Sequence, residues 1–271
     1  MFKGKESVPE TIDFTINSRA AWEEHKSRLT WNESRVDWEA GLAANQVYRN
    51  KGLFVTYQAG CFGYDFVQRF AGAPTVLKAM IDDPAWVKEM INAVADLITA
   101  AVEEMLRRGF QFYGAFIAND MGYRNGTFFS CAMYNAFEFP SQKRLCDFFH
   151  SRGMPVILHT DGNVNQFIPL FIEAGFDCLQ PLEVKAGMDL VGLKRDYGDR
   201  LAFMGGIDAR AMADPDPSVI EHEIATKIPV AKQGGGYIYH SDHSVPDNVS
   251  FEQYQRALEL VKKHGLYGGA S

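Results

Sequence analysis

Imidazole and carboxylate side chains recur two residues apart at two places in this sequence. An apolar run ends in His-Thr-Asp-Gly at 159–162, and a second run, Tyr-Ile-Tyr, leads into His240 and Asp242. Residues i and i+2 of a strand point to the same side. His159 can therefore face one small ligand or ion together with Asp161, and His240 can do so together with Asp242.

Both ligand types suit zinc and similar divalent ions, and a catalytic metal site commonly uses three protein ligands and keeps one position open. The two pairs predict a divalent-metal site, zinc or a similar ion, whose ligands come from His159, Asp161, His240 and Asp242. A metal-free interpretation uses His243 as an acid, base or hydrogen-bond donor. Spacing alone leaves both open, because His-x-Asp pairs are common by chance.

These pairs belong to a wider pattern of short apolar runs with polar ends. Six runs are continuously apolar and too short for isolated helices, which is typical of parallel strands covered on both faces: 53–60, 112–120, 155–162, 177–183, 201–208 and 237–244. Asp120, Glu183 and Asp208 end three of them. The carboxyl ends of barrel strands share one face, so these side chains should converge. A single one could instead cap a helix or form a turn, and capping is the favoured interpretation for Asp208.

Helical patterns separate the strands. Residues 84–108 carry one apolar stripe, with Pro84 at the front and Gly109 at the C-terminal cap position. Residues 131–152 are helical on both sides of Pro140, which should break the segment. Strand and helix alternate with short links, which predicts βαβ units on a parallel sheet.

The N-terminal residues differ from the rest. Residues 1–50 indicate an irregular arm and a helical segment without a clear strand. We therefore expect a single α/β domain, with this N-terminal part at 1–50 and a β/α barrel at 51–271. The last helix should begin at Ser250, which has a capping-box spacing to Gln253.

Composition narrows the class of protein. Of 271 residues, 46% are hydrophobic and 23% are charged, which is typical of a globular protein. A net charge of −7 without a basic cluster argues against nucleic acid as a partner. The sequence has no apolar run of membrane-spanning length and no signal-peptide pattern. Four cysteines without a paired spacing suggest reduced thiols and a cytoplasmic protein.

Two glycine clusters have different predicted roles. Gly234–Gly236 precede a strand instead of following one, so we expect a helix-to-strand turn and no phosphate loop. Gly205 and Gly206 should let backbone and ligand approach closely at a strand end.

The sequence resembles the uroporphyrinogen decarboxylase superfamily, which also contains zinc-dependent, corrinoid-linked methyltransferases. The resemblance runs from about residue 8 to 267 and is most specific at 119–130, 152–164, 176–190, 201–210 and 240–254. It implies a distorted, TIM-like eight-stranded β/α barrel. Since only six strands are recognisable, the first strands of the family fold should be missing here. The arm at 1–50, a partner or an earlier start of the natural protein would then fill the gap, and we expect a homodimer.

Departures from the family motifs favour the methyltransferase branch. The resemblance implies a His-x-Cys-Gly motif and a later cysteine that hold a thiol-activating zinc. Here Asp161 replaces the first cysteine, and the later position falls at or beside Asp242. Carboxylates in place of thiolates shift the preference toward harder ions.

The decarboxylase pattern is less complete. The resemblance implies that the true enzyme needs no metal, and that N-terminal arginines and an early aspartate grip an acidic tetrapyrrole. Both elements would precede residue 1. Asp120 aligns with a serine of that site, and only His243 matches. A net charge of −7 also disfavours an octacarboxylate substrate.

We therefore expect a metal-assisted methyltransferase of the corrinoid-linked type that acts on a small molecule, with the corrinoid carried by a partner protein. His243, Asp120 and His159 would be catalytic. The residues expected to contact substrate are Tyr123, Arg124, Glu183 and Asp208. The alternatives are the metal-free carboxy-lyase reaction of porphyrin biosynthesis and a non-catalytic barrel subunit that docks on another protein.

Overall fold

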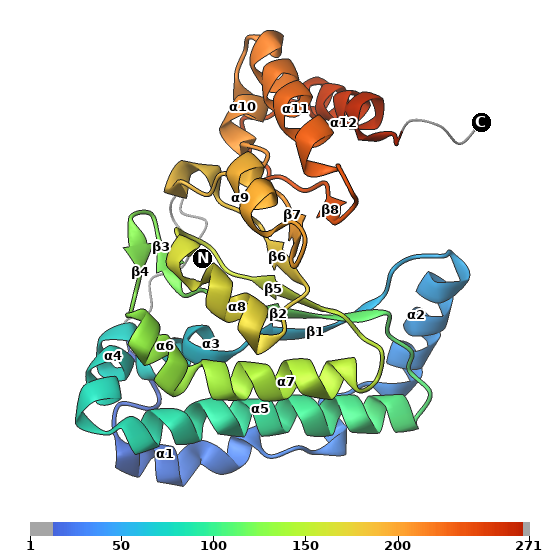
Figure 1. The fold of residues 1–271 in the computed structure, drawn as a ribbon. Helices are drawn as coiled ribbons and strands as arrows, with labels where there is room; N and C mark the ends of the chain where they lie inside the picture. Colours follow the sequence, from blue (N-terminus) through green and yellow to red (C-terminus); the bar gives the residue numbers. More distant parts are fainter. Residues whose placement is uncertain (1–12, 268–271) are drawn as a thin grey trace.

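A six-stranded parallel sheet forms the centre of the computed structural model, which describes residues 13–267. The strand order is β1-β2-β5-β6-β7-β8, and Figure 1 shows the strands stepping upward in that order. Their bounds are β1 Thr56–Cys61, β2 Gly114–Ala118, β5 Val156–His159, β6 Cys178–Gln180, β7 Ala202–Met204 and β8 Tyr237–Ile238. All six predicted strands are confirmed. The first twelve residues of the predicted arm lie outside the described residues.

Helices follow the strands and cover the sheet. They are α1 Arg19–His25, α2 Trp38–Asn50, α3 Gly63–Ala71, α4 Ala73–Asp82, α5 Pro84–Arg107, α6 Cys131–Phe137, α7 Phe139–His150, α8 Ile168–Ala174, α9 Leu190–Tyr197, α10 Ala209–Ala213, α11 Pro217–Ala231 and α12 Phe251–Gly265. Short 3-10 turns occur at η1 Lys26–Leu29, η2 Glu33–Arg35, η3 Asn165–Phe167 and η4 Val184–Ala186. In Figure 1, α5 and α7 lie side by side below the sheet, and α11 and α12 lie at the opposite end.

Local signals explain several helix ends. Pro84 opens α5, and the Asp83 side chain accepts from Trp86 N at 3.2 Å. The predicted break before Pro140 falls at Glu138, between α6 and α7. The capping box of α12 is present, with Ser250 and Gln253 bonded reciprocally. These local patterns confirm the predicted helix boundaries.

Two features near the site have no counterpart in the sequence prediction. Helices α3 and α4 fill the connection from β1 to α5, and a small hairpin, β3 Gly122–Tyr123 and β4 Gly126–Thr127, follows β2. The hairpin directly follows β2 in sequence. The start of α3 lies next to the end of β2 in space, because Phe62 N, at the N-cap of α3, donates to Ala118 O at 2.7 Å.

The sheet is an incomplete barrel. Among the described residues, no strand pairs with the outer edge of β1 or of β8. One cavity is nevertheless lined by Gln58 of β1 and by His240 and His243 beyond β8. The sheet therefore curls enough for residues from both of its edge strands to reach the same cavity.

The N-terminal helices contact the main body. Ile16 and Trp22 belong to the same buried cluster as the sheet and α5, and Arg19 pairs with Asp83 at 2.9 Å. The domain boundary at residue 50 and the homodimer stay predictions. No helix in the described part of the chain is long and apolar enough to cross a membrane.

Candidate metal centre

Two glycines let the loops after β2 and β5 touch. Gly162 has φ +83°, and a Cβ there would lie 2.4 Å from Gly122 C and from Tyr123 N. A Cβ on Gly122 would lie 2.7 Å from Asp161 O. Asn163 N donates to Tyr123 O at 2.9 Å across the contact. Glycine at both positions allows the two loops to approach this closely, and the approach brings Asp120 and Asp161 together.

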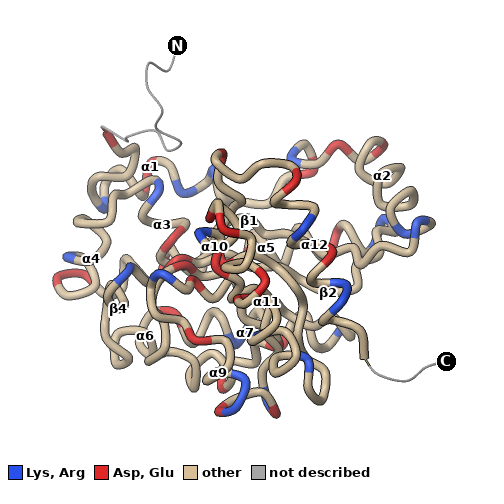
Figure 2. The backbone as a smooth tube through the Cα atoms, turned by 90° about the horizontal axis from the view of Figure 1, so that it is seen from above, with Lys and Arg blue, Asp and Glu red and all other residues tan. Residues whose placement is uncertain are grey.

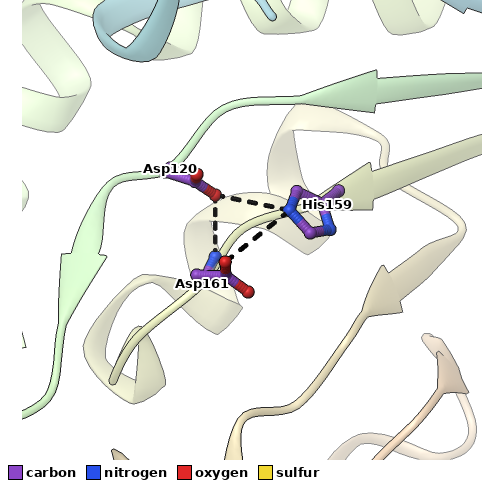
Figure 3. Close-up of side chains that lie close together, drawn as sticks. All are labelled: Asp120, His159 and Asp161. Atoms are coloured by element: carbon purple, nitrogen blue, oxygen red, sulfur yellow. Dashed lines mark hydrogen bonds and ion pairs between the residues drawn. The ribbon is translucent and has the colours of Figure 1, made fainter. Parts of the chain in front are cut away.

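Asp120, His159 and Asp161 form a compact triad at this contact. One ligand atom from each lies within 4.8 Å of the others. His159 Nε2 is 3.6 Å from Asp120 Oδ1 and 3.9 Å from Asp161 Oδ2, and Figure 3 shows the three side chains converging. Both distances exceed a normal hydrogen bond. Ligand atoms at about 2.1 Å from one ion are separated by roughly 3.0–4.2 Å, so the spacing suits a shared cation.

Contacts around the imidazole decide which nitrogen faces the carboxylates. His159 Nδ1 bonds to Gln180 Oε1, and the ring stacks on Phe116 with centroids 6.1 Å apart. An amide oxygen can only accept, so Nδ1 carries the hydrogen when Gln180 is oriented this way. Nε2 of the neutral ring then presents its lone pair to the carboxylates, which is the orientation a metal ligand needs.

The two carboxylates differ in their partners. Asp120 Oδ1 accepts from Asp161 N at 2.9 Å. Burial raises the pKa of Asp120 and the Asp161 charge adds to the rise, while the bond from Asp161 N opposes it. Asp161 Oδ1 is buried and has no hydrogen-bond partner among residues 13–267. The oxygen that faces His159 is Oδ2, and a cation bound there would offset part of the cost of holding this carboxylate with an unpaired oxygen. The donor set therefore fits a divalent ion.

His159 and Asp161 of the triad line a cavity of about 400 Å³. Its lining combines an aromatic ring, amides and imidazoles: Gln58, Phe116, Ala118, His159, Asp161, Gln180, Pro181, His240, His243 and Ser244. None of these lining residues is Lys or Arg. Figure 2 shows Asp and Glu positions gathered in the middle of the view, between α3, α10 and α11. The volume of the cavity suits a small molecule, and its lining has no Lys or Arg side chain that could pair with a polyanion.

Asp242 does not belong to the triad. Its carboxylate accepts from Val184 N at 2.9 Å and from Ala209 N at 2.8 Å. The side chain is buried, and burial raises its pKa while the two backbone donors oppose the rise. Asp242 thus ties the loops after β6 and β7 together. Asp120, expected to handle protons, occupies the place beside His159 and Asp161 that we expected for Asp242.

The two remaining histidines line the cavity. His240 Nδ1 bonds to Ser241 O at 2.5 Å, which leaves Nε2 as the ring atom available to a ligand. His243 is exposed. The structure thus brings four of the expected catalytic and metal-ligating residues to the cavity lining, namely His159, Asp161, His240 and His243.

The four expected substrate contacts lie outside the cavity lining. Tyr123 and Arg124 are exposed on the β3–β4 hairpin. Glu183 accepts from Gly162 N at 2.8 Å and pairs with Lys185, so it holds the loop that carries Asp161. Asp208 caps α10 by accepting from Arg210 N at 2.8 Å, which confirms the capping interpretation.

Two residues near the site lie outside the expected catalytic, substrate and metal sets. Gln180 orients His159, and Asn119 bonds His159 O through its backbone N at 2.9 Å. Asn119 stands at the predicted strand end beside Asp120, where the strand-end rule points. Gln180 ends β6 three residues before the predicted end at Glu183, so the rule selected Glu183 instead.

The glycine clusters behave partly as expected. Gly234–Gly236 turn from α11 to β8, as predicted. At Gly205, however, a Cβ would lie 2.0 Å from Pro181 O, and at Gly206 it would lie 2.8 Å from Leu190 Cβ. The close approach at this strand end is between protein atoms, because the loop after β6 and helix α9 already occupy the space expected for a ligand.

Comparisons with known proteins agree with this fold. A sequence model of the family described as Uroporphyrinogen decarboxylase (URO-D) matches residues 69–264. Uroporphyrinogen decarboxylases from Pectobacterium atrosepticum and Pectobacterium carotovorum are each 25% identical over 192 residues, which cover 69% of this chain and 51% of the relative. The chain thus spans about half the length of these curated relatives.

A solved structure gives the second comparison. A methyltransferase from Methanosarcina mazei superposes with a TM-score of 0.62 at 17% sequence identity, covering 81% of this chain and 62% of that chain. At this identity the likeness shows a shared fold. Together with the family match, it confirms the α/β barrel-type fold predicted from the sequence.

Proposed function

The chain belongs to the uroporphyrinogen decarboxylase (URO-D) family, and from this premise we propose that it is a metal-assisted methyltransferase acting on a small molecule. Asp120, His159 and Asp161 would hold one divalent ion. The observation that carries the proposal is the convergence of one ligand atom from each of these three side chains, all within 4.8 Å of one another.

A bound divalent ion would supply Lewis-acid polarisation of a substrate heteroatom. The protein side chains have separate tasks. Gln180 keeps His159 Nε2 directed at the carboxylates, and Phe116 limits the tilt of the ring. His243 and His240 line the same cavity and can move a proton to or from a bound substrate.

The remaining expected residues keep proposed roles that fit their positions. Tyr123 and Arg124 extend from the hairpin that contacts the Asp161 loop, from which they could reach a bound substrate or partner. Glu183 and Asp208 act as positioning residues, because backbone and basic partners already occupy their oxygens. The family resemblance adds a corrinoid protein as the methyl-carrying partner.

Metal-free decarboxylation has weaker support. The curated relatives that match are named as decarboxylases. The cavity lining contains no Lys or Arg that could pair with a polycarboxylate. Retained turnover of uroporphyrinogen after treatment with a chelator, lost in His243→Ala, would establish that alternative.

The test of the proposal is elemental analysis of the purified protein and of matched variants. We expect about one equivalent of divalent metal in the unmodified protein, and less than about a tenth of an equivalent in His159→Ala and Asp161→Asn. The control is His150→Ala, which removes a histidine bonded to Asp177 at 2.8 Å outside the cavity lining.

Methyl transfer to small thiols and amines is then assayed with a methylated corrinoid. We expect activity that the chelator abolishes and added divalent metal restores. Metal content far below one equivalent that His159→Ala leaves unchanged would contradict the proposal.

A further inference from the structure

A fully buried carboxylate lies behind the triad, at the break between α6 and α7. Glu138 is 0% exposed and accepts three hydrogen bonds. The donors are Tyr64 N at 2.9 Å, Asn119 Nδ2 at 2.7 Å and Gln142 Nε2 at 3.3 Å. All three are uncharged. Burying a carboxylate without a cationic partner is expensive, so the arrangement calls for a role beyond filling space.

Glu138 and Asn119 together serve the N-terminus of α3. The N-cap residue of that helix, Phe62, makes no side-chain cap. Instead Tyr64 N donates to Glu138, and Asp65 N donates to Asn119 Oδ1 at 3.1 Å. The first-turn N–H groups of a helix need such acceptors, and the helix dipole favours a negative one.

The approach is too close for any side chain at the start of α3. A Cβ on Gly63 would lie 2.2 Å from Glu138 Oε2 and 2.4 Å from Asn119 Nδ2. The helix start, the end of β2 and the α6–α7 break are therefore in direct contact at this glycine.

Asn119 connects this contact to the metal centre. It directly precedes Asp120, and its backbone N donates to His159 O at 2.9 Å. Its side chain is held at both ends, by Glu138 and by Asp65 N. We infer that Glu138 and Asn119 form a buried carboxylate–amide pair that positions Asp120 and His159 for the divalent ion. This inference rests on the proposed function.

The direction of each hydrogen bond in the pair is determined. Asn119 Oδ1 must accept from Asp65 N, so its Nδ2 faces Glu138, which must accept from it and from Tyr64 N. In Glu138→Gln, the new amide has a single accepting oxygen, so its NH2 group would face one of these two donors and that hydrogen bond would be lost. Above pH 7, where Glu138 is ionised, Asn119→Asp would set two carboxylates against each other. The double variant exchanges carboxylate and amide, and it restores every bond of the pair except the 3.3 Å contact from Gln142.

The test uses Co²⁺ as the probe, with its affinity measured by calorimetry and its ligand geometry by visible absorption. We expect each single variant to bind Co²⁺ about tenfold more weakly or worse, as is typical when outer-shell partners of metal ligands are removed. The double variant should recover most of the affinity and of the absorption spectrum, because the two sites are energetically coupled.

The matched control is Ser141→Ala on the same helix as Gln142. Ser141 is 3% exposed and bonds to Asn92 Oδ1 at 2.9 Å, away from the triad. It should lower the melting temperature without changing the Co²⁺ affinity. Single variants that bind Co²⁺ as well as the unmodified protein would overturn the positioning role, as would a double variant without recovery. If Glu138→Gln does not fold, Asn119→Ser removes the amide donor and gives the same decision.

A second readout separates this inference from the proposed function. In metal-free protein carrying ¹⁵N-labelled histidine, the His159 ring signals should shift in the single variants and return in the double variant. An unmodified protein that does not bind Co²⁺ would contradict the metal function, and the ring signals would then decide the positioning role alone. Ring signals unchanged by Glu138→Gln would overturn it.

Discussion

His159 presents Nε2 to two carboxylates because its other nitrogen is already engaged. Gln180 is 5% exposed, and its amide oxygen accepts from Nδ1. Such a partner selects the tautomer and restricts the ring. At the scale of single residues, the chemistry of the site thus depends on a neutral side chain that is not itself a candidate ligand.

We predict that Gln180→Leu weakens divalent-metal binding about 10-fold to 100-fold, because the ring loses the acceptor that selects its tautomer. Titration calorimetry with Co²⁺ or Zn²⁺ measures the change. Gln58→Leu is the control, since Gln58 is also a cavity-lining amide but is exposed and makes no hydrogen bond to His159. Equal losses in both variants would argue against the tautomer explanation.

At the scale of elements, the site depends on two loops crossing at close range. The loop after β2 brings Asp120, and the loop after β5 brings Asp161, but only glycine at 122 and 162 permits the contact. Behind the same loops, α3 is capped by groups from other elements. The positions of Asp120 and Asp161 therefore depend on how β2, β5 and α3 pack against one another.

We predict that Gly162→Ala destabilises the protein by about 2 kcal/mol or more, through a left-handed backbone and a clash with Gly122. Gly153→Ala is the matched control. Gly153 has φ +71°, and a Cβ at this position would have no atom within 4 Å, so only the backbone cost of about 1 kcal/mol applies. Urea unfolding compares the two variants. Equal destabilisation would show that the loop contact is not tight, and only Gly162→Ala should also reduce the metal content.

At the scale of the whole molecule, the chain carries a buried group whose ionisation costs stability. Burial raises the pKa of Glu138 from its ordinary value of 4.5 to about 7, although three donors oppose the rise and Asp65 adds to it. The folded chain therefore holds this proton more tightly than the unfolded chain. The stability that Glu138 contributes is fully present below about pH 4.5 and is lost as the pH rises to about 7.

We predict that the unfolding free energy of the unmodified protein, minus that of Glu138→Gln, falls by on the order of 3 kcal/mol between pH 4.5 and pH 7, and is constant above. Chemical denaturation at a series of pH values measures this difference. Ser141→Ala, which removes no titrating group, should give a difference that does not vary with pH over the same range. A difference that rises with pH would mean that Glu138 is stabilised in its ionised form.

The sequence by itself determined the elements and the face on which the chemistry lies. Continuous apolar runs specify buried parallel strands, and polar residues directly after them must lie at one edge of the sheet. His159 and Asp161 were found in this way, as was Asp208, which caps α10. Pro140 separately predicted the break between α6 and α7, because proline cannot continue a helix.

Only the tertiary structure decided which carboxylate completes the triad. Asp120 and Asp242 both follow strands, and their local sequences do not distinguish them. The choice depends on where loops meet in space: Gly122 and Gly162 bring Asp120 to His159, while two backbone N–H groups from neighbouring loops occupy Asp242. Contacts between residues distant in sequence arise from packing, which no local periodicity encodes.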